Sequence, residues 1–323
     1  MKRFILPLLL FSSLMMPNER FKNTNEEAAG KSFRDFLKWT FTNKKPELVA
    51  IDSSDEWKEL DSGSTDYMVW IGHATYLINK DNLTVLTDPV FSKRASPVRF
   101  AGPKRLIPPA IPIDKLPPID VITVSHNHYD HLDIRSLKKI YMANPEAIFL
   151  VPMGDRHRLE RKGIKNVKEF LWWDDIEIKG SKFTFTPVQH WSARGIADRN
   201  KSLWGGWFMQ LKEEAIYHAG DTGYSKDFIE TKNRLGSPSL SLIPVGAYAP
   251  RWFMKTHHVN PPEAIQIAID LESEKNFGMH WGTFQLTDEE ILEPPKLLKE
   301  ALTDKDLPDE FFTILKPGQV VAL

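Results

Sequence analysis

The residues best suited to chemistry lie in one short stretch, Ser125 to His131, which reads Ser-His-Asn-His-Tyr-Asp-His. Neutral imidazole and carboxylate are good ligands for first-row metal ions, zinc above all. His126 and His128 are two residues apart, so on an extended segment both side chains point the same way. Asp130 and His131 fall on the following turn and can face a second position. One loop can therefore serve two metal ions. The alternative, a plain polar or helix-capping loop, is disfavoured because this stretch holds three of only ten histidines in the chain.

Three further candidate ligands each follow a predicted strand. His190 ends an alternating segment, Asp221 lies in a Gly-Asp-Thr-Gly turn, and His280 follows the apolar residues before it. Taken singly, a histidine at a strand end is more often structural, and an Asp-Thr-Gly sequence is usually a turn. They gain weight only together with the histidine-rich loop.

The order His-x-His-x-Asp-His, then a His, an Asp and a His, resembles the metallo-β-lactamase superfamily. This resemblance implies a first metal ion held by His126, His128 and His190, a second held by Asp130, His131 and His280, and Asp221 bridging both. It also implies an α/β fold, the αβ/βα four-layer sandwich, with the metals at the edge where its two sheets meet. We expect two Zn²⁺ ions, although iron and manganese accept the same ligands.

A narrower resemblance, to the N-acylphosphatidylethanolamine-hydrolysing phospholipase D family, rests on six further segments. They are Trp70 to Thr75, Leu86 to Pro97, Gly102 to Arg105, Gly220 to Tyr224, Gly246 to Met254, and His280 to Phe284. The resemblance implies a phosphodiesterase that hydrolyses N-acylphosphatidylethanolamine to phosphatidic acid and N-acylethanolamine by a metal-activated hydroxide. Two alternatives stay open. One is hydrolysis of a lactone, a β-lactam or a sugar phosphate at the same dinuclear site, and the other is a non-catalytic metal- or lipid-binding protein. A binding protein has no need of an intact dinuclear site, which favours an enzyme.

Resemblance also assigns roles beyond the ligand set. Asp221 would help to orient the nucleophile. His258 matches a histidine placed near the substrate phosphate, where it can bind an oxygen or protonate the leaving group; the alternative is a helix-capping region. Asp88 matches an aspartate behind the ligands that accepts a hydrogen bond from a ligand imidazole; the alternative is an ordinary turn. His73 lies in a Gly-His-Ala turn, where a role at the site and a structural hydrogen bond are equal alternatives.

The ligand positions require strands that end beside one another. Residues 68–71, 75–78, 83–86 and 121–124 are predicted strands, and the last of these is an apolar run typical of a strand covered on both faces. Further strands are predicted at 147–151, 183–187, 215–217, 240–243 and 275–279. Helices are predicted at 33–42, at 262–271, and after Asp133, which is a plausible N-cap.

Composition limits the remaining choices. The 323 residues are 41% hydrophobic and can bury a large core, and the net charge of −1 gives no support to nucleic-acid binding. Five basic residues, Lys93, Arg94, Lys104, Arg105 and Arg251, can meet anionic lipid head groups or be ordinary surface charge. Because the chain has no cysteine, any metal must be held by His, Asp or Glu.

The chain divides into three predicted regions: residues 1–20, an apolar N-terminal segment; 21–66, an N-terminal extension that begins as a polar linker; and 67–323, the hydrolase domain. Lys2 and Arg3 followed by an apolar run to Met16 are typical of a secretory signal. An uncleaved membrane-associating segment and a plain extension are the alternatives, so we expect an exported or membrane-associated protein, with a cytoplasmic one not excluded. The partners implied are a phospholipid substrate and peripheral membrane contact, with no nucleic acid; a homodimer is plausible from the family resemblance alone.

Overall fold

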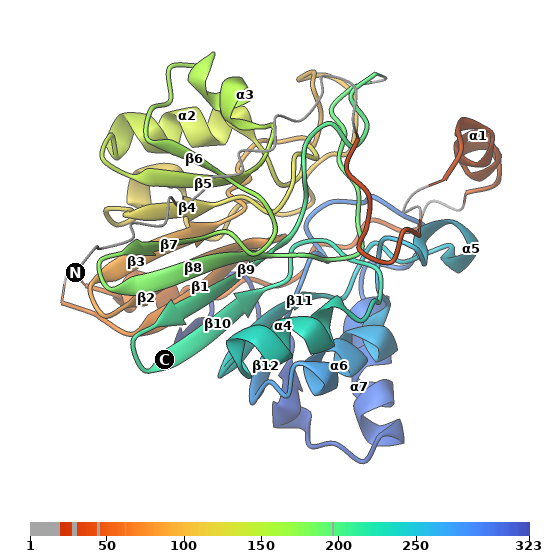
Figure 1. The fold of residues 1–323 in the computed structure, drawn as a ribbon. Coiled ribbons are helices and arrows are strands. Elements are labelled where there is room, and N and C mark those ends of the chain that lie inside the picture. The colour runs from red at the N-terminus through yellow and green to blue at the C-terminus, as the bar shows by residue number, and fades with distance from the viewer. Residues whose placement is uncertain (1–19, 28–30, 44–45, 62, 196) are drawn as a thin grey trace, which may run out of the picture.

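The computed structural model describes residues 20–323 apart from 28–30, 44, 45, 62 and 196. Two seven-stranded sheets face one another with helices on their outer sides (Figure 1). The first sheet has the order β14-β1-β2-β3-β4-β5-β6. Its strands are β1 (Tyr67–Gly72), β2 (Thr75–Lys80), β3 (Leu83–Thr87), β4 (Val121–Thr123), β5 (Ile148–Pro152), β6 (Val167–Phe170) and β14 (Val320–Ala322). Antiparallel pairing joins β14, β1, β2 and β3, whereas β3 to β6 run parallel.

The second sheet has the order β13-β12-β11-β10-β9-β8-β7. Its strands are β7 (Asp175–Ile178), β8 (Ser181–Thr186), β9 (Gly206–Leu211), β10 (Glu214–His218), β11 (Leu240–Pro244), β12 (Lys275–Met279) and β13 (Phe312–Thr313). Strands β7 to β10 pair antiparallel, and β10 to β13 run parallel. Both sheets are therefore mixed, and each contains a parallel half whose strands end at the same edge.

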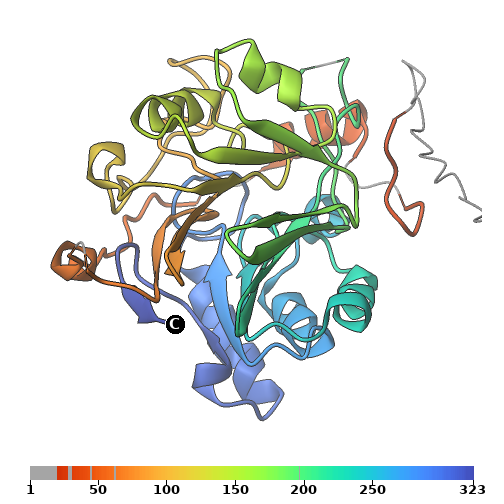
Figure 2. The same cartoon turned by 60° about the vertical axis from the view of Figure 1, so that its left-hand side comes forward.

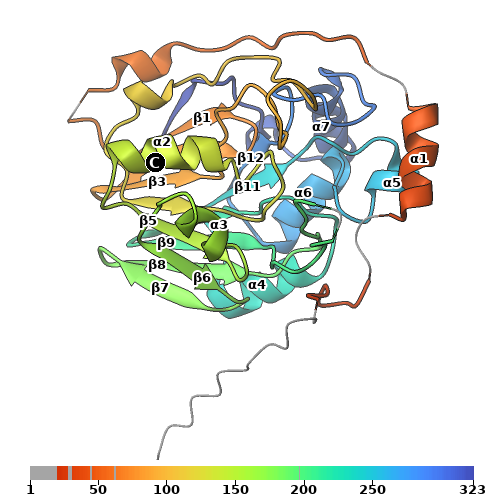
Figure 3. The same cartoon turned by 90° about the horizontal axis from the view of Figure 1, so that it is seen from above.

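Helices cover the outer faces of both sheets. In Figure 2 the yellow-green α2 (Ile134–Ala143) and α3 (Arg156–Glu160) lie on one side, and the cyan-to-blue α4 (Asp227–Leu235), α6 (Pro261–Asp270) and α7 (Glu293–Asp304) lie on the other. Two helices, α1 (Phe33–Thr42) and α5 (Arg251–Met254), lie together at one end of the molecule (Figure 3). The rings of Trp39 and Phe253 stack there at 5.2 Å between centroids. Single 3₁₀ turns occupy Glu56–Glu59, Ile113–Lys115 and Asp309–Phe311.

The core explains why the strands pack as they do. Trp70 and Tyr76 of the first sheet belong to one buried cluster with Phe183 and Trp207 of the second. Alternate residues of the first sheet, such as Val69, point outward into a second cluster with residues of α2. Each sheet is thus apolar on both faces, which requires helices outside and a partner sheet inside. The predicted αβ/βα sandwich is confirmed.

Local predictions hold where the sequence signal is strong. Asp133 caps α2 by accepting hydrogen bonds from the backbone N–H groups of Arg135 and Ser136. Helix α6 begins with a capping box between Asn260 and Glu263, one residue before its predicted start. Helix α1 has the predicted bounds.

The N-terminal region differs from the prediction where it is described. The apolar segment at residues 1–20 lies almost wholly outside the described residues. Residues 20–27 were expected to be a linker, but Asn23 is buried, and its Oδ1 accepts hydrogen bonds from the backbone N–H of His190 (3.1 Å) and the indole of Trp204 (3.0 Å). This segment therefore packs against the domain. Within the described part of the chain, none of the helices has the length and apolar character needed to cross a membrane.

Candidate metal centre

The seven predicted ligands lie together at the edge where the two sheets meet. His126, His128, Asp130 and His131 follow β4; His190 follows β8; Asp221 follows β10; and His280 follows β12. Hydrogen bonds join the sheets at this edge, since the Trp207 indole donates to the carbonyl of Val124 (2.9 Å) and the Tyr76 hydroxyl donates to the carbonyl of Gly278 (3.0 Å). The ligand loops are therefore fixed to one another by the body of the fold.

One half of the cluster consists of three imidazoles, those of His126, His128 and His190. The Nδ1 of His128 lies 2.9 Å from the Nε2 of His126 and 3.3 Å from the Nε2 of His190. Burial lowers the pKa of His126 and His190 well below its ordinary value and that of His128 to about 4. The three rings are thus neutral at neutral pH, and their converging lone pairs suit a cation.

The other half is richer in carboxylates. The Nε2 of His280 lies 3.3 Å from Asp130 Oδ2, and the Nε2 of His131 lies 3.7 Å from the same oxygen. Burial alone would lower both imidazole pKa values, but the carboxylates of Asp221 and Asp130 outweigh it. They raise the pKa of His280 to about 9 and that of His131 well above its ordinary value. This half therefore carries excess negative charge, which either protons or a cation must balance.

Asp221 lies between the two halves. Its Oδ2 is 3.1 Å from the Nε2 of both His131 and His280, 3.8 Å from that of His126 and 4.0 Å from that of His190. One carboxylate oxygen is thus within reach of imidazoles on both sides.

The arrangement fits a metal site. Ligand atoms of His126, His128 and His190 form one group within 4.8 Å of one another, and a second group contains Asp130, His131 and His280. Asp221 forms a third group with His126 and His131. Several inward-facing atoms, among them the Nε2 of His131 and the Oδ1 of Asp221, are buried without a hydrogen-bond partner. Buried polar atoms without partners are costly, and a bound cation with its water would satisfy these.

Asp88 lies directly behind one ligand. Its Oδ2 is 2.7 Å from the Nδ1 of His131, and it also accepts hydrogen bonds from the backbone N–H and the hydroxyl of Ser125, both at 2.6 Å. When the His131 ring is neutral, donation from Nδ1 leaves the Nε2 lone pair facing Asp221, so this contact selects the tautomer that can bind a metal.

His73 joins the carboxylate-rich half, which the sequence did not reveal. Its Nε2 is 3.0 Å from Asp130 Oδ2, and its ring centroid is 4.0 Å from that of His280. Burial lowers the pKa of His73 to about 3, so the neutral ring donates this hydrogen bond and holds the Asp130 carboxylate in place. A structural hydrogen bond was one of the two expectations for this residue.

His258 also lies at the cluster, with its Nδ1 3.9 Å from Asp221 Oδ2 and within the same group as His280. Burial lowers its pKa to about 4, so the ring is neutral at neutral pH and can donate a hydrogen bond. Its neighbour His257 contributes its backbone carbonyl, which accepts a hydrogen bond from the Nδ1 of His190 at 2.9 Å.

An arginine clamps the histidine-rich loop from outside. The Arg194 guanidinium donates to the carbonyls of Asn127 and Leu132, both at 2.8 Å, and lies 3.9 Å from the centre of the Tyr129 ring. In return, the Tyr129 hydroxyl donates to the carbonyl of Arg194 at 2.8 Å. These contacts bracket the ligand loop and join it to the segment after His190. No sequence signal marked Arg194 for this task.

Three residues of the site have a strained backbone conformation. His73, Asp88 and His280 have φ angles of 57°, 35° and 62°, a region that L-residues with a Cβ rarely adopt. Such conformations cost about 1–3 kcal/mol each and persist where the surrounding structure imposes them. All three follow a strand and turn their side chains into the cluster, so the strain accompanies the placement of these side chains.

Two of the five basic residues for which lipid head groups and ordinary surface charge were the alternatives are instead structural. Arg105 is buried, and its guanidinium donates to the backbone carbonyls of Val90 and Ser92. Arg251 pairs with Glu263 at 2.6 Å and donates to the carbonyl of His258 at 2.8 Å. Both hold loops of the site in position, which the sequence could not distinguish from surface charge.

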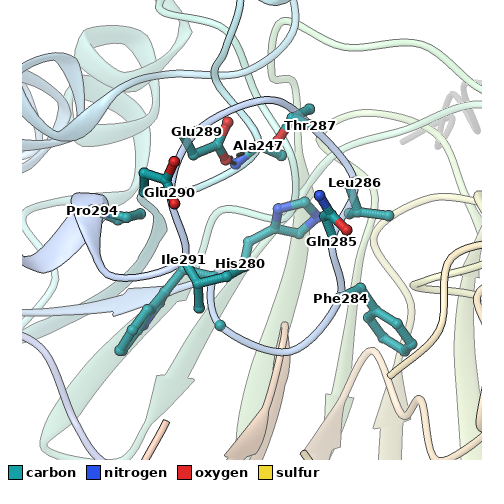
Figure 4. Close-up of a pocket in the computed structure, with 12 residues that line it drawn as sticks. Ala247, His280, Phe284, Gln285, Leu286, Thr287, Glu289, Glu290, Ile291 and Pro294 are labelled. Atoms are coloured by element: carbon teal, nitrogen blue, oxygen red, sulfur yellow. Dashed lines mark hydrogen bonds between the residues drawn. The ribbon is translucent and has the colours of Figure 1, made fainter. Parts of the chain in front are cut away.

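A small pocket lies beside His280, formed by the loop that follows it. Figure 4 shows Glu289 on this loop, turned toward Ala247. The Glu289 carboxylate accepts hydrogen bonds from the backbone N–H groups of Ala247 (2.6 Å) and Ala249 (3.0 Å) and from the Thr287 hydroxyl (2.8 Å). Glu289 therefore joins the loop after β11 to the loop after β12, beside the ligand that β12 presents.

Comparison with known proteins agrees with this geometry. The sequence profile of the beta-lactamase superfamily domain matches residues 84–281, a range that contains all seven predicted ligands. The N-acyl-phosphatidylethanolamine-hydrolyzing phospholipase D 1 of Caenorhabditis elegans is 39% identical over 266 residues, which are 79% of this chain and 75% of that protein. The mitochondrial N-acyl-phosphatidylethanolamine-hydrolyzing phospholipase D of Saccharomyces cerevisiae is 39% identical over 240 residues. That match covers 72% of this chain and about half, 51%, of the yeast protein.

Solved structures agree on the fold. An isothiocyanate hydrolase from Delia radicum gut bacteria superposes with a TM-score of 0.63 at 19% identity, covering 80% of this chain and 99% of that one. A possible metal-dependent hydrolase from Veillonella parvula superposes with a TM-score of 0.64 at 17% identity, covering 80% and 100%.

Proposed function

The chain belongs to the beta-lactamase superfamily, in the branch that contains the N-acyl-phosphatidylethanolamine-hydrolysing phospholipases D, and we propose that it hydrolyses N-acylphosphatidylethanolamine to phosphatidic acid and N-acylethanolamine. One observation carries the proposal. The 39% identity with the worm enzyme extends over 266 residues, and this chain presents a full set of seven candidate ligands in one buried cluster. Metal-dependent hydrolysis follows from family membership, and the phosphodiester substrate is the proposed step.

The donor set suits two metal ions, which we propose to be Zn²⁺; iron or manganese would accept the same ligands. His126, His128 and His190 would hold the first ion, Asp130, His131 and His280 the second, and Asp221 would bridge them. When bound, such a pair supplies an activated water and polarises a phosphoryl oxygen. The neutral imidazoles of the first half offer lone pairs to a cation, and the carboxylates of the second half supply the negative charge that balances it.

The protein's own groups have distinct tasks in this proposal. Asp221, within 4.0 Å of imidazoles in both halves, orients the attacking water. His258 has a buried and unpartnered Nδ1 beside Asp221, and its neutral ring donates a hydrogen bond to a phosphoryl or leaving-group oxygen. Asp88 contacts only His131 and Ser125 among these groups, so it positions a ligand and does not touch the substrate.

An apolar groove offers a place for an acyl chain. It runs between the segment after α1 and the loop after His280, and Leu48, Val49, Leu106 and Leu286 line it together with Trp39. The exposed side chain of Lys104 lies among its lining residues, where it can meet a lipid phosphate. Asn43, Gln285 and Asp288 also line the groove, and its apolar side chains beside a lysine suit a phospholipid better than a sugar phosphate.

The test is a substrate panel on purified protein with measured metal content. N-acylphosphatidylethanolamine, phosphatidylcholine, a lactone and a β-lactam are supplied in detergent at the same concentration. We expect release of N-acylethanolamine and phosphatidic acid, with about two metal ions per chain. Turnover of the lactone or the β-lactam alone would reject the proposed substrate while leaving the metal centre in place. Full activity of His126→Ala would reject the ligand assignment.

A further inference from the structure

One exposed segment of the chain has an unusual charge distribution. Between Asp88 and Asp114 the sequence contains no acidic residue and five basic ones: Lys93, Arg94, Arg99, Lys104 and Arg105. The chain as a whole has 42 basic and 43 acidic residues, so this excess is local. Arg105 is buried against backbone carbonyls, which leaves four cations in the part we call the cationic loop, residues 93–104.

The cationic loop meets helix α2 and forms a groove with it. Lys93, Arg94 and Arg99 line this groove together with Arg135 and Lys139 of α2. Its other lining residues are Phe91, Ser92, Ile113 and Ser136, so no carboxylate lines it. The Asp133 carboxylate lies behind this lining and accepts hydrogen bonds from the backbone N–H of Ser92 and the hydroxyl of Ser136. One acid beside five cations leaves a net positive potential that attracts anionic groups.

The loop is held in shape. The Arg135 guanidinium donates to the carbonyl of Pro97 at 3.0 Å, and the backbone N–H of Ala95 donates to the carbonyl of Pro103 at 3.1 Å. Despite these contacts, the tip presents apolar side chains to the outside, with Phe100 84% exposed and Val98 36% exposed. An aromatic ring presented this openly between cations is costly in water and suits the interfacial region of a bilayer.

The loop also lies next to the metal centre. It begins five residues after Asp88, which contacts His131. Ala95 packs in one cluster with Val90 and Phe284, and Tyr129 of the ligand loop packs against this cluster. A surface bound by the cationic loop is therefore held beside the ligand loop.

We propose that the cationic loop, with Arg135 and Lys139, docks the protein onto the surface of an anionic phospholipid bilayer, with lipid phosphates in the groove and Phe100 inserted among the acyl chains. This inference rests on the proposed lipid substrate, and it names the surface through which the protein reaches it. Charge complementarity selects anionic lipid over zwitterionic lipid, since each basic residue at such a surface contributes about fivefold to binding.

Vesicle co-sedimentation of the full chain tests this surface. Vesicles of phosphatidylcholine, and vesicles that mix phosphatidylglycerol with phosphatidylcholine, are compared for the wild type, Arg99→Glu and Phe100→Ala. Two matched controls lie at α7. Lys299→Glu on the helix makes the same charge change, and Leu292→Ala at its N-cap removes an apolar side chain that is 52% exposed. The N-terminal apolar segment is present in every variant, so its contribution cancels.

We expect Arg99→Glu to reduce partitioning onto the anionic vesicles by at least about fivefold and to leave weak binding to phosphatidylcholine unchanged. Phe100→Ala should also reduce binding to the anionic vesicles. The loss it causes should depend less on salt concentration than the loss caused by Arg99→Glu, because the contribution of Phe100 is apolar. Both α7 controls bind as the wild type does. Equal binding of Arg99→Glu and Lys299→Glu, whether both retained or both reduced, overturns the proposal.

Hydrolysis of detergent-dispersed substrate separates this inference from the proposed function. Arg99→Glu should turn over N-acylphosphatidylethanolamine in micelles at the wild-type rate, because the variant changes access to a bilayer and not the metal centre. If no protein hydrolyses the micellar substrate, the proposed substrate fails, and the vesicle result still decides the docking surface.

Discussion

The two halves of the metal centre achieve their geometry by different means. In the half formed by His126, His128 and His190, the rings are held by uncharged groups, such as the His257 carbonyl at His190 Nδ1 and the Ser125 hydroxyl at His126 Nδ1. In the half formed by Asp130, His131 and His280, the rings are held by carboxylates. The ring of His131 lies close to three of them, those of Asp88, Asp130 and Asp221.

This difference determines the charge of each half before any cation binds. Burial outweighs the Asp221 carboxylate, which lies 3.8 Å from His126 and 4.0 Å from His190, and leaves the first three imidazoles neutral. Carboxylates close to His131 and His280 raise their pKa values, so that both rings are protonated at neutral pH. The first half is ready to bind a cation, and the second must exchange protons for one.

The largest effect is expected where the halves meet. Asp221→Asn keeps the shape of the side chain but removes the charge that contacts His131 and His280 at 3.1 Å. We expect turnover to fall by more than about a hundredfold, beyond the ten- to hundredfold typical of residues behind ligands. Metal content by mass spectrometry should fall in parallel while the circular dichroism spectrum is unchanged. Wild-type metal content and activity would show that Asp221 does not bridge the halves.

A pH series is expected to separate the halves next. His280, with its pKa raised to about 9, and His131 must each lose a proton before binding a cation, so affinity of the second half should rise with pH up to about 9. Between pH 6 and pH 7 the gain approaches about a hundredfold for two protons. The first half, with the pKa of His128 at about 4, should bind almost equally at both pH values.

Calorimetry on single-half variants measures this difference. His280→Ala reports the first half and His190→Ala the second, and titration in buffers of different ionisation enthalpy counts the protons released. Equal proton release from both halves would contradict the charge difference between them.

A smaller effect, confined to one half, is expected from Asp88. Asp88→Asn removes the carboxylate 2.7 Å from the Nδ1 of His131 and should lower metal affinity of the second half by about ten- to hundredfold. The first half should change less, because the His257 carbonyl still holds His190 and Asp88 reaches His126 only through the Ser125 hydroxyl. Competition with a chelator measures both affinities in one titration. A comparable loss in the two halves would mean that Asp88 supports the whole edge and not one ligand.

Sequence reasoning recovered the parts of this centre that local signals determine. The seven candidate ligands each follow a strand, and the resemblance to the metallo-β-lactamase superfamily, added to the histidine-rich loop, predicted that they belong to one site. Asp133 could be placed as a helix cap because capping depends on residues two or three apart in the sequence.

Features that depend on distant contacts escaped prediction. β13 and β14 have two and three residues and exist only because they pair with β12 and β1. Helix α4 buries few side chains, among them Phe228, so its apolar period is weak. His73 meets Asp130 across 57 residues, a contact that depends on how β1, β2 and β4 are arranged in the first sheet.

The smallest expected effect concerns a contact of this long-range kind, between the N-terminal extension and the first half. Asn23 is 6% exposed, and its Oδ1 is the acceptor for the backbone N–H of His190, whereas the Trp204 indole also has the Val188 carbonyl at 3.0 Å. Asn23→Ala thus leaves one buried donor without its partner, which costs about 1–3 kcal/mol of unfolding free energy. It should weaken metal binding by the first half only a few-fold, because the His257 carbonyl still orients the ring.

Asn25→Ala, the same change at an exposed neighbour, should leave both denaturant unfolding and chelator competition as in the wild type. A loss of affinity in the second half equal to that in the first would place the effect of Asn23 in the fold as a whole and not at His190.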